Sequence, residues 1–237
     1  MRAFQTKRGT PMVKYEKIPF RSRRMPDYTK GEEIFNMVSH IVGAGLGIVA
    51  LVLTVVLSAV RGQVWSVVAS AIYGGSMVAL YTVSSVYHGL HLNMGKRVMQ
   101  VIDHCTIFLL IAGTYTPVVL CGIRPYSPVW GWTLFGVVWG CAALGITFTA
   151  IDMKRYAKLA MILYLGMGWC IVMAVKPALA SVPPEGLLWI LAGGVAYTVG
   201  AVLYGLGNKH RYMHSVFHVF VVAGSVLQFF GIFFYVI

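Results

Sequence analysis

The sequence predicts an all-α integral membrane protein, a bundle of seven transmembrane helices with a cytoplasmic N-terminus and a C-terminus on the outside. Hydrophobic residues make up 58% of the 237 residues and charged residues only 11%, whereas soluble domains carry about 25% charged residues. The charges gather in short segments, which leaves long uncharged runs between them. The basic residues also fall mostly on alternate connections, a pattern that indicates an orientation across the membrane.

Seven uncharged runs are long enough to be transmembrane helices, which need about 17 to 25 apolar residues. The run at residues 159–175 is the shortest and only just meets this limit. Helices of a soluble globule keep polar outer faces, and these runs have almost none, which excludes a soluble all-α protein. In chain order the runs are residues 34–60, 62–95, 104–123, 125–151, 159–175, 186–208 and 212–237.

Three local patterns add detail to these helices. The first run contains GAGLG and the fourth contains GVVWG, from Gly136 to Gly140. Small residues at this spacing let helix backbones approach closely in lipid.

In the third run, Thr116 and Pro117 predict a kink in which threonine hydroxyls bond to the carbonyls that proline leaves free. The proline-rich connection at residues 176–186 predicts an irregular external loop.

The distribution of Lys and Arg predicts the orientation. Sixteen of the nineteen lie in the N-terminal segment and in the connections that follow the second, fourth and sixth runs. The other connections contain only Arg61, Arg124 and Lys176. Because the more basic side of a membrane protein faces the cytoplasm, the N-terminus is predicted to be cytoplasmic. The net charge of +12 therefore reflects topology, and no nucleic-acid partner is expected.

Residues 1–31 form a basic tail ahead of the membrane domain, which covers residues 32–237. The tail lacks the apolar run of a secretory signal. One interpretation is attraction to anionic lipid headgroups, at about 1 kcal/mol for each basic residue near the surface. The alternatives are a disordered cytoplasmic segment, or a true start at Met12 or Met25.

Ionisable side chains within the runs are the main functional candidates, because they are costly inside a membrane. Ser84 and His88 lie one helical turn apart in the second run, and Asp103 stands near the third. His214 and His218 lie one turn apart in the last run. At 1.5 Å per residue from the nearest basic residue, these groups lie roughly 4 to 12 Å into the membrane. We therefore expect them to meet at a similar depth on the cytoplasmic side.

These residue types fit a metal site. The H-x₃-H spacing of His214 and His218 presents two imidazoles on one helix face, and His88 would supply a third. Zinc is the expected ion, because three protein nitrogens plus water are typical of a catalytic zinc site. Asp103 would hold water at the metal and accept its proton. Ser84 would donate a hydrogen bond to that water, to Asp103 or to a substrate oxygen. The alternative is that the histidines only pack between helices or lie at the interface.

The first run adds a further polar face. Glu32, Asn36 and His40 are spaced four residues apart, and Glu33 lies one step from that face. One interpretation is that these side chains orient the metal ligands or line a cytoplasmic entrance. The alternative is an ordinary helix start, where acidic residues are favoured by the helix dipole. This alternative accounts for Glu32 and Glu33 but not for His40.

Taken together, these motifs resemble the hemolysin III family, the bacterial branch of the progestin and adipoQ receptor group, which is related to alkaline ceramidases. The resemblance spans Glu32 to Ile237 and implies seven helices, a cytoplasmic N-terminus and zinc held by three histidines. The family name also implies cytolytic activity. The motifs that carry the resemblance are E…N-x₃-H on Glu33 or Glu32, Asn36 and His40; S-x₃-H on Ser84 and His88; the acidic residue Asp103; and H-x₃-H on His214 and His218.

The leading functional hypothesis is a zinc-dependent hydrolase of a lipid amide or ester in the bacterial inner (plasma) membrane. Membrane lipid is then both its surroundings and the source of a lipid-like substrate. Two alternatives stay open: a non-catalytic membrane sensor or regulator with structural zinc, and a cytolysin. The sequence predicts no particular oligomeric state.

Overall fold

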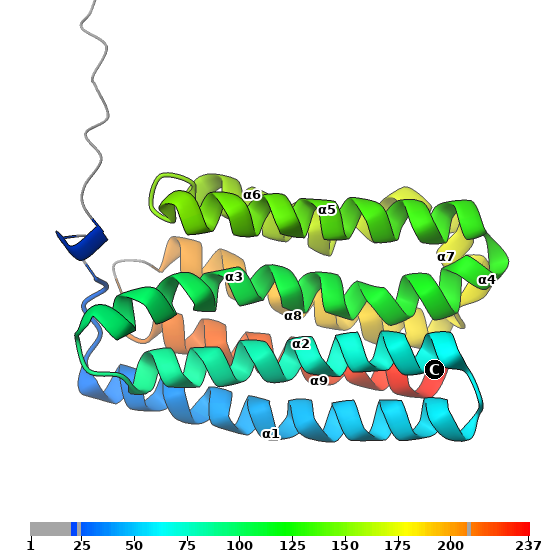
Figure 1. The fold of residues 1–237 in the computed structure, drawn as a ribbon, viewed down its shortest axis with the longest axis horizontal. Coiled ribbons are helices and arrows are strands. Elements are labelled where there is room, and N and C mark those ends of the chain that lie inside the picture. Colours follow the sequence, from blue (N-terminus) through cyan, green and yellow to red (C-terminus); the bar gives the residue numbers. More distant parts are fainter. Residues whose placement is uncertain (1–19, 23–24, 208–209) are drawn as a thin grey trace, which may run out of the picture.

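The computed structural model describes residues 20–22, 25–207 and 210–237, and these residues form helices without strands. Seven spans are long and apolar enough to cross a membrane, which confirms the predicted number (Figure 1). They are Lys30–Val60, Val64–Gly89, Met94–Tyr126, Pro128–Asp152, Ala157–Ser181, Pro184–Leu206 and Met213–Tyr235. Most of the predicted tail, residues 1–19 and 23–24, lies outside the described residues.

Two of the spans combine several helical segments. The third comprises α3, η2 and α4, and the fifth comprises α6, η3 and α7. The elements are η1 (Phe20–Ser22), α1 (Lys30–Val60), α2 (Val64–Gly89), α3 (Met94–Pro117), η2 (Val118–Ile123), α4 (Arg124–Tyr126), α5 (Pro128–Asp152), α6 (Ala157–Gly168), η3 (Cys170–Ala174), α7 (Val175–Ser181), α8 (Pro184–Leu206) and α9 (Met213–Tyr235).

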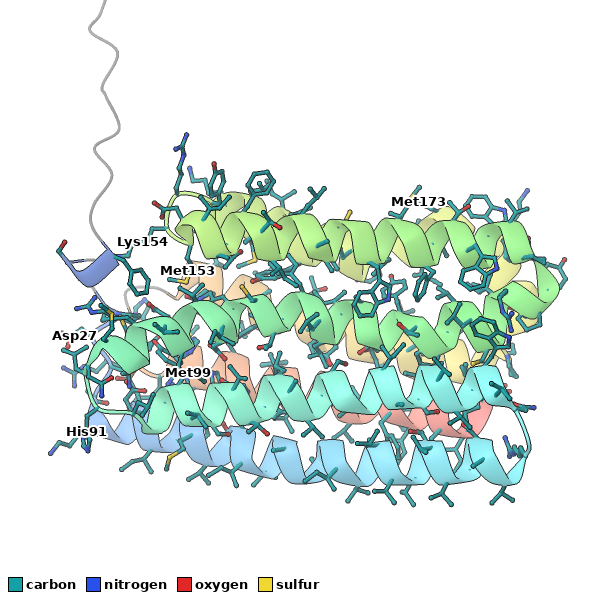
Figure 2. All side chains as sticks on the ribbon, in the orientation of Figure 1. Asp27, His91, Met99, Met153, Lys154 and Met173 are labelled. Atoms are coloured by element: carbon teal, nitrogen blue, oxygen red, sulfur yellow. The ribbon has the colours of Figure 1, made fainter. Side chains whose placement is uncertain are left out.

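Helices from distant parts of the sequence lie side by side in the bundle. α1 packs against both α2 and α9, and α3 packs against α2 and α5 (Figure 1). We call the end of the bundle where α1 begins the basic end, because basic residues lie at the connections there. Figure 2 shows Asp27, His91 and Lys154 at this end and Met173 well away from it. α2 ends, and α3 and α9 begin, at the basic end (Figure 1).

Small residues bring α1 and α2 close together, as predicted for GAGLG. A Cβ atom added at Gly43 would lie 2.6 Å from the Tyr81 ring of α2, so only glycine fits there. The same prediction for GVVWG is wrong. A Cβ atom at Gly136 or Gly140 would meet nothing within 4 Å among the described residues, so these glycines do not bring two helices of this chain together.

The third span changes its winding at Pro117. It becomes a π-helix at Val118–Ile123, directly after the proline, and this is the form that the predicted irregularity takes. The Thr116 hydroxyl donates to the Ala112 carbonyl at 2.8 Å. It does not serve the Gly113 carbonyl, which is the one that loses its usual α-helical donor to Pro117.

The predicted external loop at residues 176–186 is wrong over most of its length. Val175–Ser181 is the helix α7, which prolongs the fifth span after the 3₁₀ segment Cys170–Ala174. Pro177 lies in the first turn of α7, where its missing N–H removes no intrahelical hydrogen bond. The irregular connection is therefore confined to Val182 and Pro183.

Candidate metal centre

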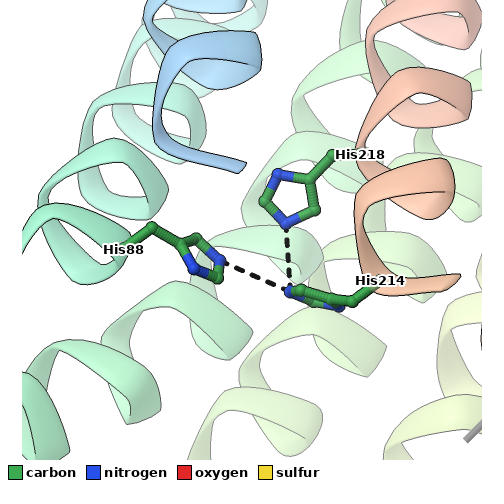
Figure 3. A group of neighbouring side chains, drawn as sticks. All are labelled: His88, His214 and His218. Atoms are coloured by element: carbon green, nitrogen blue, oxygen red, sulfur yellow. Dashed lines mark hydrogen bonds between the residues drawn. The ribbon is translucent and has the colours of Figure 1, made fainter. Parts of the chain in front are cut away.

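Three histidines from two spans meet at the basic end of the bundle. His88 lies in the last turn of α2, His214 in the first turn of α9, and His218 one turn later. The Nε2 atoms of His214 and His88 lie 3.4 Å apart, and those of His218 and His214 lie 3.1 Å apart (Figure 3). Among the described residues, this is the one group of at least three potential ligands whose atoms all lie within 4.8 Å.

Glu33 determines which nitrogen of His88 faces this cluster. Its Oε2 atom lies 2.6 Å from Nδ1 of His88. A carboxylate only accepts hydrogen bonds, so the proton of a neutral His88 is on Nδ1 and its Nε2 presents a lone pair to the cluster. The other oxygen of Glu33 accepts a hydrogen bond from Lys96 Nζ at 2.7 Å, which balances the negative charge of this partly buried carboxylate.

The spacing of the ring nitrogens fits a zinc ion. A tetrahedral ion with Zn–N bonds of about 2.0–2.1 Å holds its nitrogen ligands roughly 3.3 Å apart. The observed separations of 3.4 and 3.1 Å lie on either side of that value. Where all three rings present an Nε2 lone pair, a cation between them would satisfy the three nitrogens together. His88, His214 and His218 therefore could hold a metal ion.

Ser84 and Asp103 lie beside the cluster rather than within it. Both are buried, and the Ser84 side chain lies close enough to interact with the Asp103 carboxylate. Both line the same cavity as His214 and His218. The structure thus brings the predicted serine and carboxylate to the cavity wall next to the predicted ligands.

The residues of the first span divide into two roles. Glu32 closes a capping box with Thr29, and its Oε1 atom accepts a hydrogen bond from the backbone N–H of Tyr212 at 2.6 Å. It therefore fixes the start of α1 to the residue that precedes α9, whereas Glu33 reaches the histidine cluster.

Asn36 and His40 lie deeper, between α1 and α9. The His40 ring stacks on that of His218, with ring centres 3.7 Å apart and planes inclined by 19°. Asn36 is fully buried. Neither the Asn36 amide nor the His40 ring nitrogens have a hydrogen-bond partner among the described residues.

Three residues next to the site were not among the sequence candidates. Tyr28 stacks on His214 with ring centres 5.0 Å apart, although it lies in the segment predicted as tail, where no periodicity marks it. Burial raises the pKa of the Tyr28 phenol far above its usual range, so the phenol stays neutral. Lys96 counted in the sequence only as one of the basic residues that indicate orientation across the membrane. His104 lines the cavity, and its Nδ1 atom lies 3.8 Å from Asp103.

The cavity next to the histidines is large and mostly apolar. Its volume is about 660 Å³, within the range of about 300–1,000 Å³ that is usual for sites binding small molecules. Its polar lining includes Ser84, Asp103, His214 and His218, and also Gln100, Thr198 and Gln228. Its apolar and aromatic lining includes Leu110, Ile111, Tyr164, Trp169, Phe217 and Val221.

The fold and the site define a class: a multi-pass integral membrane protein with a buried three-histidine cluster. The family model described as Haemolysin-III related matches residues 28–229, so the chain belongs to the haemolysin-III-related family.

Its relatives include bacterial and mammalian proteins. It is 39% identical over 214 residues to Hemolysin-3 of Bacillus cereus, which covers 90% of this chain and 95% of that protein. It is 38% identical over 208 residues to the Hemolysin-3 homolog of Bacillus subtilis (strain 168), covering 88% and 96%. A more distant relative is the human monocyte to macrophage differentiation factor, 25% identical over 210 residues, covering 85% of this chain and 83% of that protein.

Proposed function

We propose that this protein is a zinc-dependent hydrolase that cleaves an amide or ester bond of a membrane lipid. The observation that carries the proposal is the convergence of three imidazole Nε2 atoms beside a large, mostly apolar cavity that His214 and His218 line. A bound zinc ion supplies Lewis-acid chemistry, making water more acidic and polarising a carbonyl group. The apolar part of the cavity suits an acyl chain, which brings the bond next to the chain's carbonyl to the polar wall.

The chain's own residues would divide the remaining work. Asp103 would take a proton from water and return it to the leaving group, as a general base and then a general acid. Ser84, whose side chain interacts with Asp103, would hold that carboxylate in one orientation by donating a hydrogen bond to it. Glu33 would keep the Nε2 lone pair of His88 directed at the metal. The burial of Ser84 and Asp103 limits their contact with bulk water.

We further propose that the protein lies in the bacterial inner (plasma) membrane with its N-terminus in the cytoplasm. Two observations support this: the bacterial relatives at 38–39% identity, and the concentration of basic residues at one end of the bundle. The site would then open toward the cytoplasmic leaflet.

The test is zinc content and lipid turnover of the full-length protein, purified in detergent. Zinc is counted per chain, and fatty-acid release is followed on a panel of lipid amides and esters. The proposal predicts turnover that falls by about 10²- to 10⁴-fold in Asp103→Asn, while zinc stays bound. Glu185→Gln, the same chemical change at an exposed residue in the first turn of α8, serves as control and should match the wild type.

Two results would contradict the hydrolase. Stoichiometric zinc without turnover on any lipid of the panel would favour a membrane regulator held together by structural zinc. Haemoglobin release from erythrocytes without lipid turnover would favour cytolysis, the activity named in the Bacillus cereus relative.

A further inference from the structure

Metal-binding histidines usually donate the N–H of their second ring nitrogen to a carboxylate or carbonyl, which fixes the ring. His88 follows this rule through Glu33. The two histidines of α9 do not. Nδ1 of His214 is buried and has no hydrogen-bond partner among the described residues. Nδ1 of His218 is also buried without a well-formed hydrogen bond there, although the backbone of Asn36 lies close to this ring. Neither ring is therefore held by a charged hydrogen-bond partner of the kind that Glu33 gives His88.

The His214 ring lies against the face of Tyr28. The ring centres are 5.0 Å apart and the planes are inclined by only 10°. Glu32 helps to fix the relative position of the two rings, because its carboxylate bonds to the residue after Tyr28 and to a residue two positions before His214. Its Oε2 atom accepts from the Thr29 backbone N–H at 2.8 Å, and its Oε1 atom accepts from the Tyr212 backbone N–H at 2.6 Å.

The His218 ring lies against the face of His40, with centres 3.7 Å apart and planes inclined by 19°. His40 is fixed in turn by the edge of Tyr81, whose ring centre is 5.0 Å away at an angle of 80°. The Tyr81 hydroxyl bonds to Ser225 of α9 at 2.6 Å. His40 therefore lies between His218 and Tyr81, and Tyr81 is itself hydrogen-bonded to α9.

We propose that Tyr28 and His40 are positioning residues for the metal, whose ring faces orient His214 and His218 in place of second-sphere hydrogen bonds. The inference rests on the proposed metal centre and adds two residues to it. A ring stacked against the imidazole face restricts rotation of the imidazole about its Cβ–Cγ bond, and this restraint needs no hydrogen bond at Nδ1. Loss of one stack should weaken metal binding by about 3- to 10-fold, the range expected for an aromatic pair.

The experiment measures Co²⁺ and Zn²⁺ binding to the full-length protein in detergent, using dissociation constants and the visible absorption bands of bound Co²⁺. Tyr28→Leu should weaken binding by about 3- to 10-fold and change the Co²⁺ bands. Tyr28→Phe, which keeps the ring and removes the hydroxyl, should restore wild-type affinity and bands. Tyr126→Leu, the same change at an exposed tyrosine of α4, is the matched control.

His40→Leu and His40→Phe repeat the comparison for the second stack. Because His40 is buried within the bundle, the thermal unfolding midpoint is measured for each of these variants. If His40→Leu does not fold, the Tyr28 pair decides the inference, since Tyr28 lies outside the membrane spans.

The possible outcomes separate this inference from the metal centre itself. Wild-type affinity in Tyr28→Leu would overturn the inference while leaving the metal centre intact. Faster metal release from Tyr28→Leu at an unchanged dissociation constant would also overturn it, because Tyr28 would then be only a cover over the site. A wild-type protein that binds neither ion would overturn both the inference and the metal centre.

Discussion

At the scale of single residues, Glu33 does two things: it pairs with the charge of Lys96, and it orients the ring of His88. Its carboxylate bridges His88 and Lys96 through hydrogen bonds of 2.6 and 2.7 Å. Lys96 also donates to the Leu90 carbonyl at 2.9 Å, which fixes the ammonium group at the end of α2. Lys96 therefore neutralises the negative charge of Glu33, and Glu33 orients one ring, that of His88.

Replacing Glu33 by Gln should weaken zinc binding by about 10- to 100-fold, as is usual for the loss of a charged partner behind a histidine ligand. The glutamine has the same size but no charge, and its amide can also face His88 with its NH₂ group. Competition with a chelator of known affinity measures the effect. The control is Glu185→Gln, far along the sequence in α8, and equal affinities of the two variants would contradict the role of Glu33.

The sequence could identify the histidine set but not the choice between Glu32 and Glu33. Helical spacing predicted the shared face of His214 and His218, and depth predicted their meeting with His88. The two glutamates are adjacent, so spacing alone left both open. Their roles depend on tertiary contacts: Tyr212 donates its backbone N–H to Glu32, and His88 donates to Glu33.

At the scale of helices, α1 and α2 pack through glycines that have no room for a side chain. A Cβ atom at Gly74 would lie 2.5 Å from Cα of Leu51, and a backbone atom cannot move aside as a flexible side chain can. A Cβ atom added at the neighbouring Gly75 would meet nothing within 4 Å among the described residues. Since α1 carries Glu33 and α2 carries His88, this close packing also sets the distance across which the two residues bond.

The pair gives a matched test of packing. Gly74→Ala should lower the thermal unfolding midpoint in detergent, with a loss of about 1–3 kcal/mol expected for overpacking. Gly75→Ala should leave the midpoint unchanged or raise it, because alanine is the better helix former by about 1 kcal/mol. Equal midpoints for the two variants would mean that the helices do not pack through Gly74.

The number and approximate positions of the spans could be predicted from the sequence. The uncharged runs located all seven spans, because a bilayer core requires a minimum apolar length. Prolines were the less reliable signal. Pro177 was interpreted as part of a loop although it begins α7, and a proline in a first helical turn costs little. The packing prediction for GVVWG was wrong within this chain, because glycine spacing permits close helix packing but does not specify which helix lies opposite.

At the scale of the whole molecule, the histidine cluster lies at the end of the bundle with the basic connections. On the orientation proposed above from the positive-inside rule, that end faces the cytoplasm. A reporter that is active only outside the cytoplasm, such as alkaline phosphatase, should therefore be active when fused after Ile237. A fusion in the connection between α5 and α6 at Arg155 should be inactive. The reversed pattern would contradict the orientation.

The central claim is that helices α2 and α9 together hold one metal ion. Zinc counted per chain in the intact purified protein tests it most directly. We predict close to one zinc in the wild type and in His91→Ala, a change at an exposed histidine, and a large loss in His88→Ala and in the double variant His214→Ala/His218→Ala. A wild type without zinc, or a double variant that keeps it, would contradict the claim.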